Sequence, residues 1–114
     1  MAEQVLRRVE RDQAARAGHA LRAREVARQM AALLAHEPGV RRVWLFGSLA
    51  GGLVHERSDI DLAVEGLSPE REAATTRRLE AMTDLPLDLV RLEDVLEPMR
   101  ERILTDGELL YVAR

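Results

Sequence analysis

The 114-residue sequence contains no cysteine and no lysine. Without cysteine there can be no disulfide bond and no metal site built on thiolates. Without lysine there can be no mechanism that depends on a lysine amine, and every basic Lys/Arg position is an arginine. No apolar run approaches the roughly 20 residues that a membrane-spanning helix needs. Residues 1–18 are charged throughout and lack the apolar core of a signal peptide. We therefore expect a cytoplasmic protein without a membrane partner.

The overall composition is that of a small globular protein with a slight excess of acid. Hydrophobic residues make up 46% of the chain and charged residues 32%, so a packed core is possible. The length suits one domain, which we expect to span residues 1–114, with residues 1–36 as an N-terminal helical segment. The formal net charge of −3 argues against direct nucleic-acid binding, because such proteins usually carry a basic surface.

The N-terminal segment has the spacing of a long helix. Apolar residues recur at roughly helical intervals through residues 2–36, and the only glycine among them is Gly18. One helix, or two helices joined near Gly18, would end at Pro38 and Gly39. The helix could cover a sheet, which we favour, or its charged part could project and dock a partner.

The remaining chain alternates strands and helices. Strands are predicted at 40–46, 58–66 and 85–92, from runs rich in branched and apolar residues. Ser68 and Pro69 open a predicted helix that runs to about residue 82. A last helix is predicted from residue 93 or 94 to Gly107, with Pro98 in its first turns, followed by a short closing strand or tail. The fold class is α+β: a layered α/β sandwich in which helices pack on a small mixed sheet.

Three acids interrupt the predicted strands. Asp59 and Asp61 share one face of their strand, because strand side chains alternate in direction. Asp88 lies in the next predicted strand and could complete a cluster if the two strands are neighbours. Like charges this close need a cation, and Mg²⁺ favours carboxylate oxygens while leaving room for phosphate. Three acids can hold two such ions for displacement at phosphorus. The alternative is that these acids end a strand or point to water.

A Gly-Ser pair follows the first predicted strand. Gly47 would allow the backbone to approach a phosphate closely, and Ser48 would add a hydroxyl donor at the start of a helical turn. Taken alone, the pair fits an ordinary turn between a strand and a helix. The combination is more specific: an apolar strand, Gly47-Ser48, ten residues, then Asp59-Ile60-Asp61 on a second strand, and Asp88 on a third.

This combination resembles the nucleotidyltransferase superfamily that includes DNA polymerase beta, from about Val40 to Leu92. The resemblance implies that Gly47 and Ser48 hold a nucleoside triphosphate and that Asp59 and Asp61 bind two Mg²⁺ ions. It also implies a third acid, Asp88, which serves the metal on the acceptor side and can act as general base. Relatives commonly read Gly-Ser-Arg-Ala-Arg-Gly at the loop. This chain has Gly47-Ser48-Leu49-Ala50-Gly51-Gly52, so Arg57 is the candidate replacement for a phosphate-binding arginine.

The small size resembles the minimal nucleotidyltransferases of prokaryotes. Members of that subgroup are often encoded beside a helical HEPN protein as a toxin–antitoxin pair, and some transfer AMP from ATP onto a tyrosine of the toxin. The resemblance thus implies AMP transfer onto a hydroxyl of a partner protein. One alternative is a binding module that neutralises the partner without chemistry, which the missing loop arginines favour. Transfer to a small molecule or RNA is a third alternative, disfavoured by the lack of room for a substrate domain.

Overall fold

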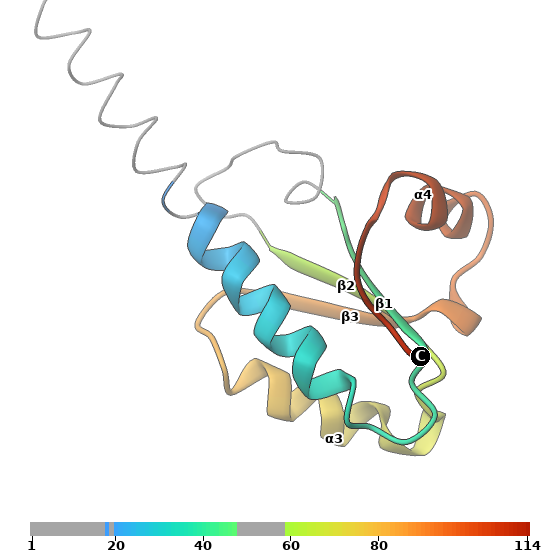
Figure 1. Cartoon of the computed structure of the whole chain (residues 1–114), viewed down its shortest axis with the longest axis horizontal. Coiled ribbons are helices and arrows are strands. Elements are labelled where there is room, and N and C mark those ends of the chain that lie inside the picture. The colour runs from blue at the N-terminus through green and yellow to red at the C-terminus, as the bar shows by residue number, and fades with distance from the viewer. Residues whose placement is uncertain (1–17, 19, 48–58) are drawn as a thin grey trace, which may run out of the picture.

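The computed structural model describes residue 18, residues 20–47 and residues 59–114. A helix covers residues 20–34, and the elements after it are β1 (Arg42–Phe46), β2 (Ile60–Glu65), α3 (Pro69–Glu80), β3 (Leu87–Arg91), the 3₁₀ turn η1 (Leu92–Asp94), α4 (Met99–Asp106) and β4 (Glu108–Val112) (Figure 1). No helix in these ranges is both long and apolar enough to cross a membrane.

The strands form one mixed sheet in the order β3-β2-β1-β4. The central strand β1 pairs antiparallel with β2 and with β4, while β2 and β3 run parallel. This confirms the α+β class and the small mixed sheet. The closing segment, expected to be a strand or a tail, is a full strand, because β4 supplies the second neighbour of β1.

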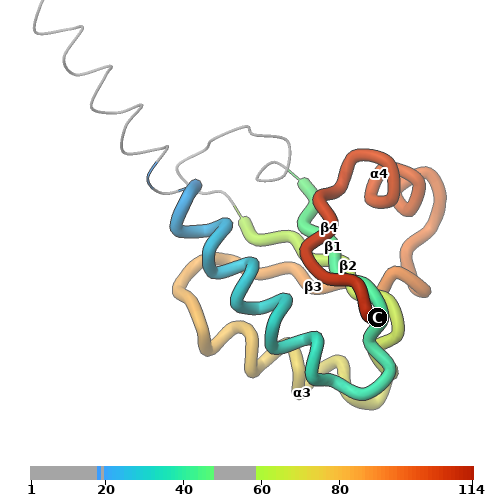
Figure 2. Tube along the Cα trace, in the orientation of Figure 1, coloured from blue at the N-terminus to red at the C-terminus, as the bar shows by residue number. Residues whose placement is uncertain are grey.

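The two faces of the sheet have different coverings. One face packs against the N-terminal helix and α3, which lie on the same side of the sheet in Figures 1 and 2. The opposite face, which we call the α4 face, packs against Ile103 of α4 and Leu92 of η1. Strand alternation explains the division, because Leu62 and Val64 of β2 enter the first core while Ala63 enters the second. The buried residues of the first core are Ala23, Ala27, Met30, Ala31, Leu34, Val40, Val43, Leu45, Ile60, Leu62, Val64, Leu67, Leu79 and Leu89.

The N-terminal helix covers the sheet over its described part. Ala23, Ala27, Met30 and Leu34 recur at intervals of three or four residues and are fully buried in the first core. Small alanines bring the helix close to the strands, and Met30 fills the space between them. The helix ends in turns before Gly39, as predicted. Residues 1–17 lie outside the described part of the chain.

The predicted helix start at Ser68 and Pro69 is confirmed, whereas the prediction of one last helix needs correction. Ser68 is at the N-cap of α3, but its side chain forms no capping hydrogen bond, and Pro69 occupies the first turn. The predicted helix over 93–106 is divided into η1 and α4. Val95 is extended, with φ −81° and ψ 131°, and Pro98 is the N-cap of α4 rather than a residue within it. Proline disfavours a helical conformation for the residue before it and lacks an N–H, which explains the interruption.

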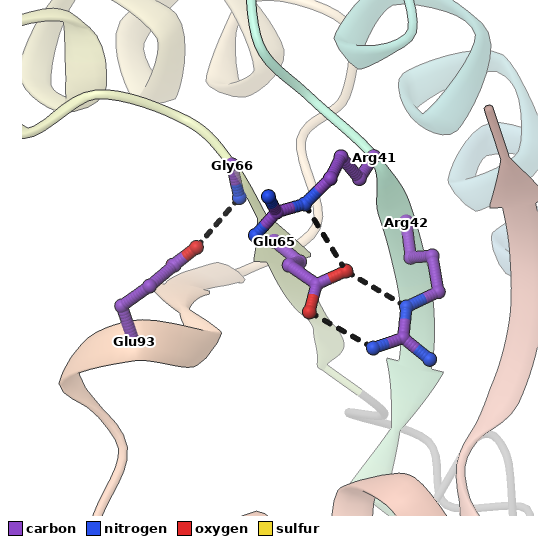
Figure 3. A network of polar contacts seen from close by, with 5 residues as sticks. All are labelled: Arg41, Arg42, Glu65, Gly66 and Glu93. Atoms are coloured by element: carbon purple, nitrogen blue, oxygen red, sulfur yellow. Dashed lines mark hydrogen bonds and ion pairs between the residues drawn. The ribbon is translucent and has the colours of Figure 1, made fainter.

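A salt-bridge network holds the end of the sheet remote from the three acids. Arg42 of β1 binds Glu65 of β2 through two hydrogen bonds of 2.8 and 2.9 Å, and Arg41 lies 3.7 Å from the same carboxylate (Figure 3). The Gly66 N–H donates to Glu93 at 2.6 Å. These contacts hold the start of β1, the end of β2 and η1 in fixed positions relative to one another.

A buried carboxylate links the N-terminal helix to α3. The side chain of Glu37 is only 2% exposed and accepts hydrogen bonds from Arg71 at 2.5 Å and from Arg78 at 3.1 Å. The hydrogen bond from Arg71 lowers the pKa of Glu37 below its ordinary value, against the opposing effect of burial. Removing this charge leaves the two guanidinium groups without their shared charged acceptor.

We expect Glu37→Gln to lower the free energy of unfolding by about 1 to 3 kcal/mol at neutral pH. Because the folded-state pKa is lowered, the contribution of the carboxylate is present above the ordinary glutamate pKa and is lost as pH falls through the folded value. Urea unfolding at a series of pH values would measure this. Two results would contradict this role of the Glu37 carboxylate. One is a variant as stable as wild type at neutral pH, and the other is a difference in the free energy of unfolding that is the same at every pH.

Candidate active site

Two of the predicted acids lie opposite each other on neighbouring strands. In the parallel β2–β3 pair, Asp61 is in register with Asp88, and in the antiparallel β1–β2 pair it is in register with Phe46. Residues in register point to the same side of a sheet, so all three lie on the α4 face. Asp59 lies just before β2 and is exposed. The fold therefore places Asp61 beside Asp88, although the two residues are 27 positions apart in the sequence.

The neighbouring acids change the pKa of Asp61. Its side chain is half-buried, and burial raises the pKa of the carboxyl above its ordinary value. The negative charges of Asp88 and Asp59 raise that pKa further. The site thus holds negative charge at a cost that a bound cation would relieve.

Gly47 closes the site at the carboxyl end of β1. Its backbone has φ +76°, a conformation that L side chains rarely adopt. A Cβ on Gly47 would lie 2.3 Å from Oδ2 of Asp61, so the main chain is in direct contact with the carboxylate. The glycine of the Gly-Ser pattern therefore lies beside Asp61. Ser48 and Arg57, the other two predicted nucleotide-binding residues, lie outside the described residues.

We expect Gly47→Ala to displace the Asp61 carboxylate and to reduce stability by about 1 to 3 kcal/mol. Two causes act together: the positive φ and the contact with Asp61. In an Asp61→Ala background only the first cause remains, so the same substitution should cost less there. Thermal unfolding of the four proteins of this cycle would measure the coupling. Equal costs in both backgrounds would contradict a contact between Gly47 and Asp61.

The donor chemistry of the acids fits a divalent cation. Asp59, Asp61 and Asp88 would offer only carboxylate oxygens, which Mg²⁺ prefers, and the charges of Asp59 and Asp88 raise the pKa of Asp61. Within the ranges that the structure describes, no group of three or more acidic or histidine side chains is arranged so that it could hold a metal ion. The arrangement is an open one, with Asp61 and Asp88 on rigid strands and Asp59 at a strand end.

Trp44 lies on the same face of the sheet as the acids. It pairs with Ala63, which is two residues from Asp61 on β2. It is 4% exposed and packs in the second core with Ile103. Arg42 covers its ring, with the guanidinium carbon 4.7 Å from the ring centroid. Trp44 is a core residue, and its covered ring is not available to stack on a ligand.

A cavity adjoins the acids on the α4 face. It has a volume of about 360 Å³ and is lined by Phe46, Gly47, Met99, Arg102, Ile103, Asp106 and Gly107. The sequence pattern did not indicate it, because it forms only where β4 returns α4 to the end of β1. The helical spacing of Met99, Arg102, Ile103 and Asp106 was the one available signal, since residues three and four apart share a helix face.

Comparison with known proteins matches most of the chain to one family. The family model described as polymerase beta nucleotidyltransferase matches residues 28–114. A curated relative, protein adenylyltransferase MntA of Shewanella oneidensis, is 30% identical over 77 residues, which cover 65% of this chain and 55% of the relative. The match thus spans little more than half the length of that relative.

Solved structures share the fold. A toxin–antitoxin structure with AMP-PNP superposes with a TM-score of 0.65 and is 26% identical, covering 78% of this chain and 74% of the other. An MNT antitoxin structure from Shewanella oneidensis, in complex with a tri-AMPylated HEPN toxin, gives a TM-score of 0.61 at 22% identity, covering 80% of this chain and 73% of the other. With the family match over most of its length, the chain belongs to the polymerase beta nucleotidyltransferase family.

Proposed function

We propose that this protein transfers AMP from ATP onto a hydroxyl group of a partner protein, in a reaction that requires magnesium. The observation that carries the proposal is the register of Asp61 with Asp88, with Gly47 against the Asp61 carboxylate. Rigid strands set the separation of two of the acids, and an adjacent backbone segment without a side chain leaves room for phosphate. MntA, the curated relative, is a protein adenylyltransferase, which supports the choice of reaction.

Each acid has a role in the proposed site. Asp59, Asp61 and Asp88 would hold magnesium, which supplies positive charge for the triphosphate and lowers the pKa of the acceptor hydroxyl. Gly47 and Ser48 would hold the phosphates, with Arg57 adding a charge-assisted donor. Asp88 is exposed on the edge strand of the sheet, where an acceptor can approach it.

The proposed reaction is a single displacement at phosphorus. The acceptor oxygen forms a bond to the α-phosphorus of ATP while the bond from that phosphorus to the oxygen bridging the α- and β-phosphates breaks. The hydroxyl proton passes to the Asp88 carboxylate, and pyrophosphate leaves with the electron pair of the broken bond. The products are an adenylylated protein and pyrophosphate.

The proposed acceptor is a HEPN-type toxin, with this chain as its antitoxin. Two neighbours support this choice, since one is a toxin–antitoxin structure with AMP-PNP and the other holds a HEPN toxin that carries AMP groups. A competing role is neutralisation by binding alone. The sequence Gly47 to Gly52, which contains no arginine, favours that role because it lacks a positive charge for the departing phosphates.

The position of the radioactive label in ATP separates these possibilities. Purified protein, Mg²⁺ and a lysate of the source organism would be incubated with ATP labelled on either the α- or the γ-phosphate, beside an Asp59→Ala, Asp61→Ala control. Proposed transfer predicts one protein band with α-label that appears with wild type and is absent from the control, and no γ-labelled band that depends on the wild-type protein. A γ-labelled band seen with wild type and absent from the control would indicate a kinase. Magnesium-dependent ATP binding without any band would favour neutralisation by binding.

A further inference from the structure

The cavity between the end of β1 and α4 shares a wall with the acid site. Phe46 is in register with Asp61, and Gly47, whose added Cβ would touch Oδ2 of Asp61, lines the cavity itself. A molecule whose phosphates lie at Gly47 and the acids therefore has this cavity as an adjoining space. Its volume of about 360 Å³ falls within the range of small-molecule sites.

The lining has the character of a nucleobase site. Phe46, Met99 and Ile103 offer apolar surface for the faces of a flat ring, and Arg102 and Asp106 add one donor and one acceptor group. Arg102 and Asp106 are four residues apart, so they lie on one face of α4. Among the residues that the structure describes, the side chains of Arg102 and Asp106 form no hydrogen bond or ion pair with another residue. Both polar groups are therefore available to a ligand.

The negative charge of Asp106 lies at an unfavourable position, the C-terminal end of α4. It occupies the last turn of α4, which contains no basic residue. Backbone carbonyls at a helix C-terminus disfavour a negative charge, so this carboxylate weakens the helix in the absence of a partner. A donor from a ligand would compensate for that cost.

We propose that this cavity binds the purine base of the nucleotide, with the Asp106 carboxylate accepting a hydrogen bond from the amino group of adenine. Arg102 donates to an acceptor nitrogen of the same ring, because adenine presents an amino donor beside a ring acceptor on each edge. Phe46 and Met99 contact the faces of the ring. This inference rests on the proposed function, and it assigns the selection of the base to α4, an element outside the acid site.

Binding measurements test the proposal without a partner protein. Isothermal titration calorimetry with Mg²⁺ would compare ATP, purine riboside triphosphate (which lacks the amino group), CTP and inorganic triphosphate. We expect ATP to bind about tenfold more tightly than the purine riboside analogue, the difference that one hydrogen bond to a charged group supplies. Asp106→Ala should remove that difference and leave the affinity for inorganic triphosphate unchanged.

Matched variants exclude general effects on α4. Glu101→Ala removes an acid from the first turn of the same helix, outside the cavity, and should change no affinity. Met99→Trp would fill the cavity and should lower the affinity for ATP at least about tenfold while sparing inorganic triphosphate. Asp106→Ala should unfold at the same or a higher temperature than wild type, because it removes an unfavourable helix-end charge.

The outcomes separate this inference from the function on which it rests. Equal affinities for ATP, the purine analogue and CTP, unchanged in the cavity variants but lost in Asp61→Asn, would overturn the base site and leave the acid site standing. Loss of inorganic triphosphate binding in Asp106→Ala would also overturn the base site, since Asp106 would then act on phosphates. Failure of wild type to bind any triphosphate would overturn both proposals.

Discussion

Asp61→Asn is expected to reduce nucleotidyl transfer at least about 100-fold, the loss typical when a charge-stabilising group is removed from an active site. Asparagine keeps the size of the side chain but removes the charge that, with Asp88 in register, would hold magnesium. The rate would be measured as incorporation of α-labelled AMP into the acceptor. Asp84→Asn, in the exposed turn before β3, is the matched control and should retain the full rate.

The same substitution should not weaken the metal-free fold. Burial, Asp88 and Asp59 all raise the pKa of Asp61, so the ionised form is disfavoured in the folded state. Stability therefore falls as pH rises from the ordinary aspartate pKa through the raised folded value. Asp61→Asn avoids this loss and should unfold at an equal or higher temperature at neutral pH, with the difference shrinking in acid. An unfolded variant, or one that transfers AMP at the wild-type rate, would contradict the assigned role.

Gly66→Ala is expected to lower the free energy of unfolding by about 2 to 4 kcal/mol, from backbone strain and overpacking together. Gly66 has φ +98°, and an added Cβ would lie 2.0 Å from the Gly39 oxygen and 3.2 Å from the Arg41 nitrogen. These are main-chain atoms, which cannot rotate away as a side chain could. The neighbouring Arg41 N–H donates to the Glu65 oxygen at 2.8 Å, so any shift would also disturb the β1–β2 pair.

Gly18→Ala provides the control for that prediction. Among the described residues, a Cβ on Gly18 would meet only the end of the Arg22 side chain, at 3.4 Å. Alanine is the better helix former, so this variant should be as stable as wild type or more so. Chemical denaturation of both variants would measure the difference. If the free energy of unfolding of Gly66→Ala were within about 0.5 kcal/mol of wild type, the main chain at Gly66 could move away from Gly39 without cost, and the prediction would be wrong.

The acids were predictable because their signal is local. Asp59 and Asp61 stand two residues apart in an apolar run, and that spacing alone places them on one side of an extended chain. Asp88 was predictable as an acid in another apolar run. Its register with Asp61 was not, because register depends on the parallel pairing of β2 with β3 across the whole of α3.

Other features depend on contacts that a local pattern does not carry. Pro98 was visible in the sequence, but whether it lies within a helix or before one was decided by the extended Val95. The face of Trp44 required the antiparallel register with β2. The cavity beside Gly47 required β4 to pair with β1, which brings α4 to the end of the first strand. The surroundings of the candidate site therefore depend on the strand topology, whereas its candidate acids could be identified from local spacing in the sequence.

We propose that the acids on β2 and β3 bind a nucleotide through a divalent cation. The most direct test is isothermal titration calorimetry of a non-hydrolysable ATP analogue, with Mg²⁺ and with a chelator, for wild type and Asp61→Asn. We predict binding by wild type that requires Mg²⁺ and that Asp61→Asn loses. Binding of equal strength in the presence of chelator, or binding unaffected by Asp61→Asn, would contradict the account.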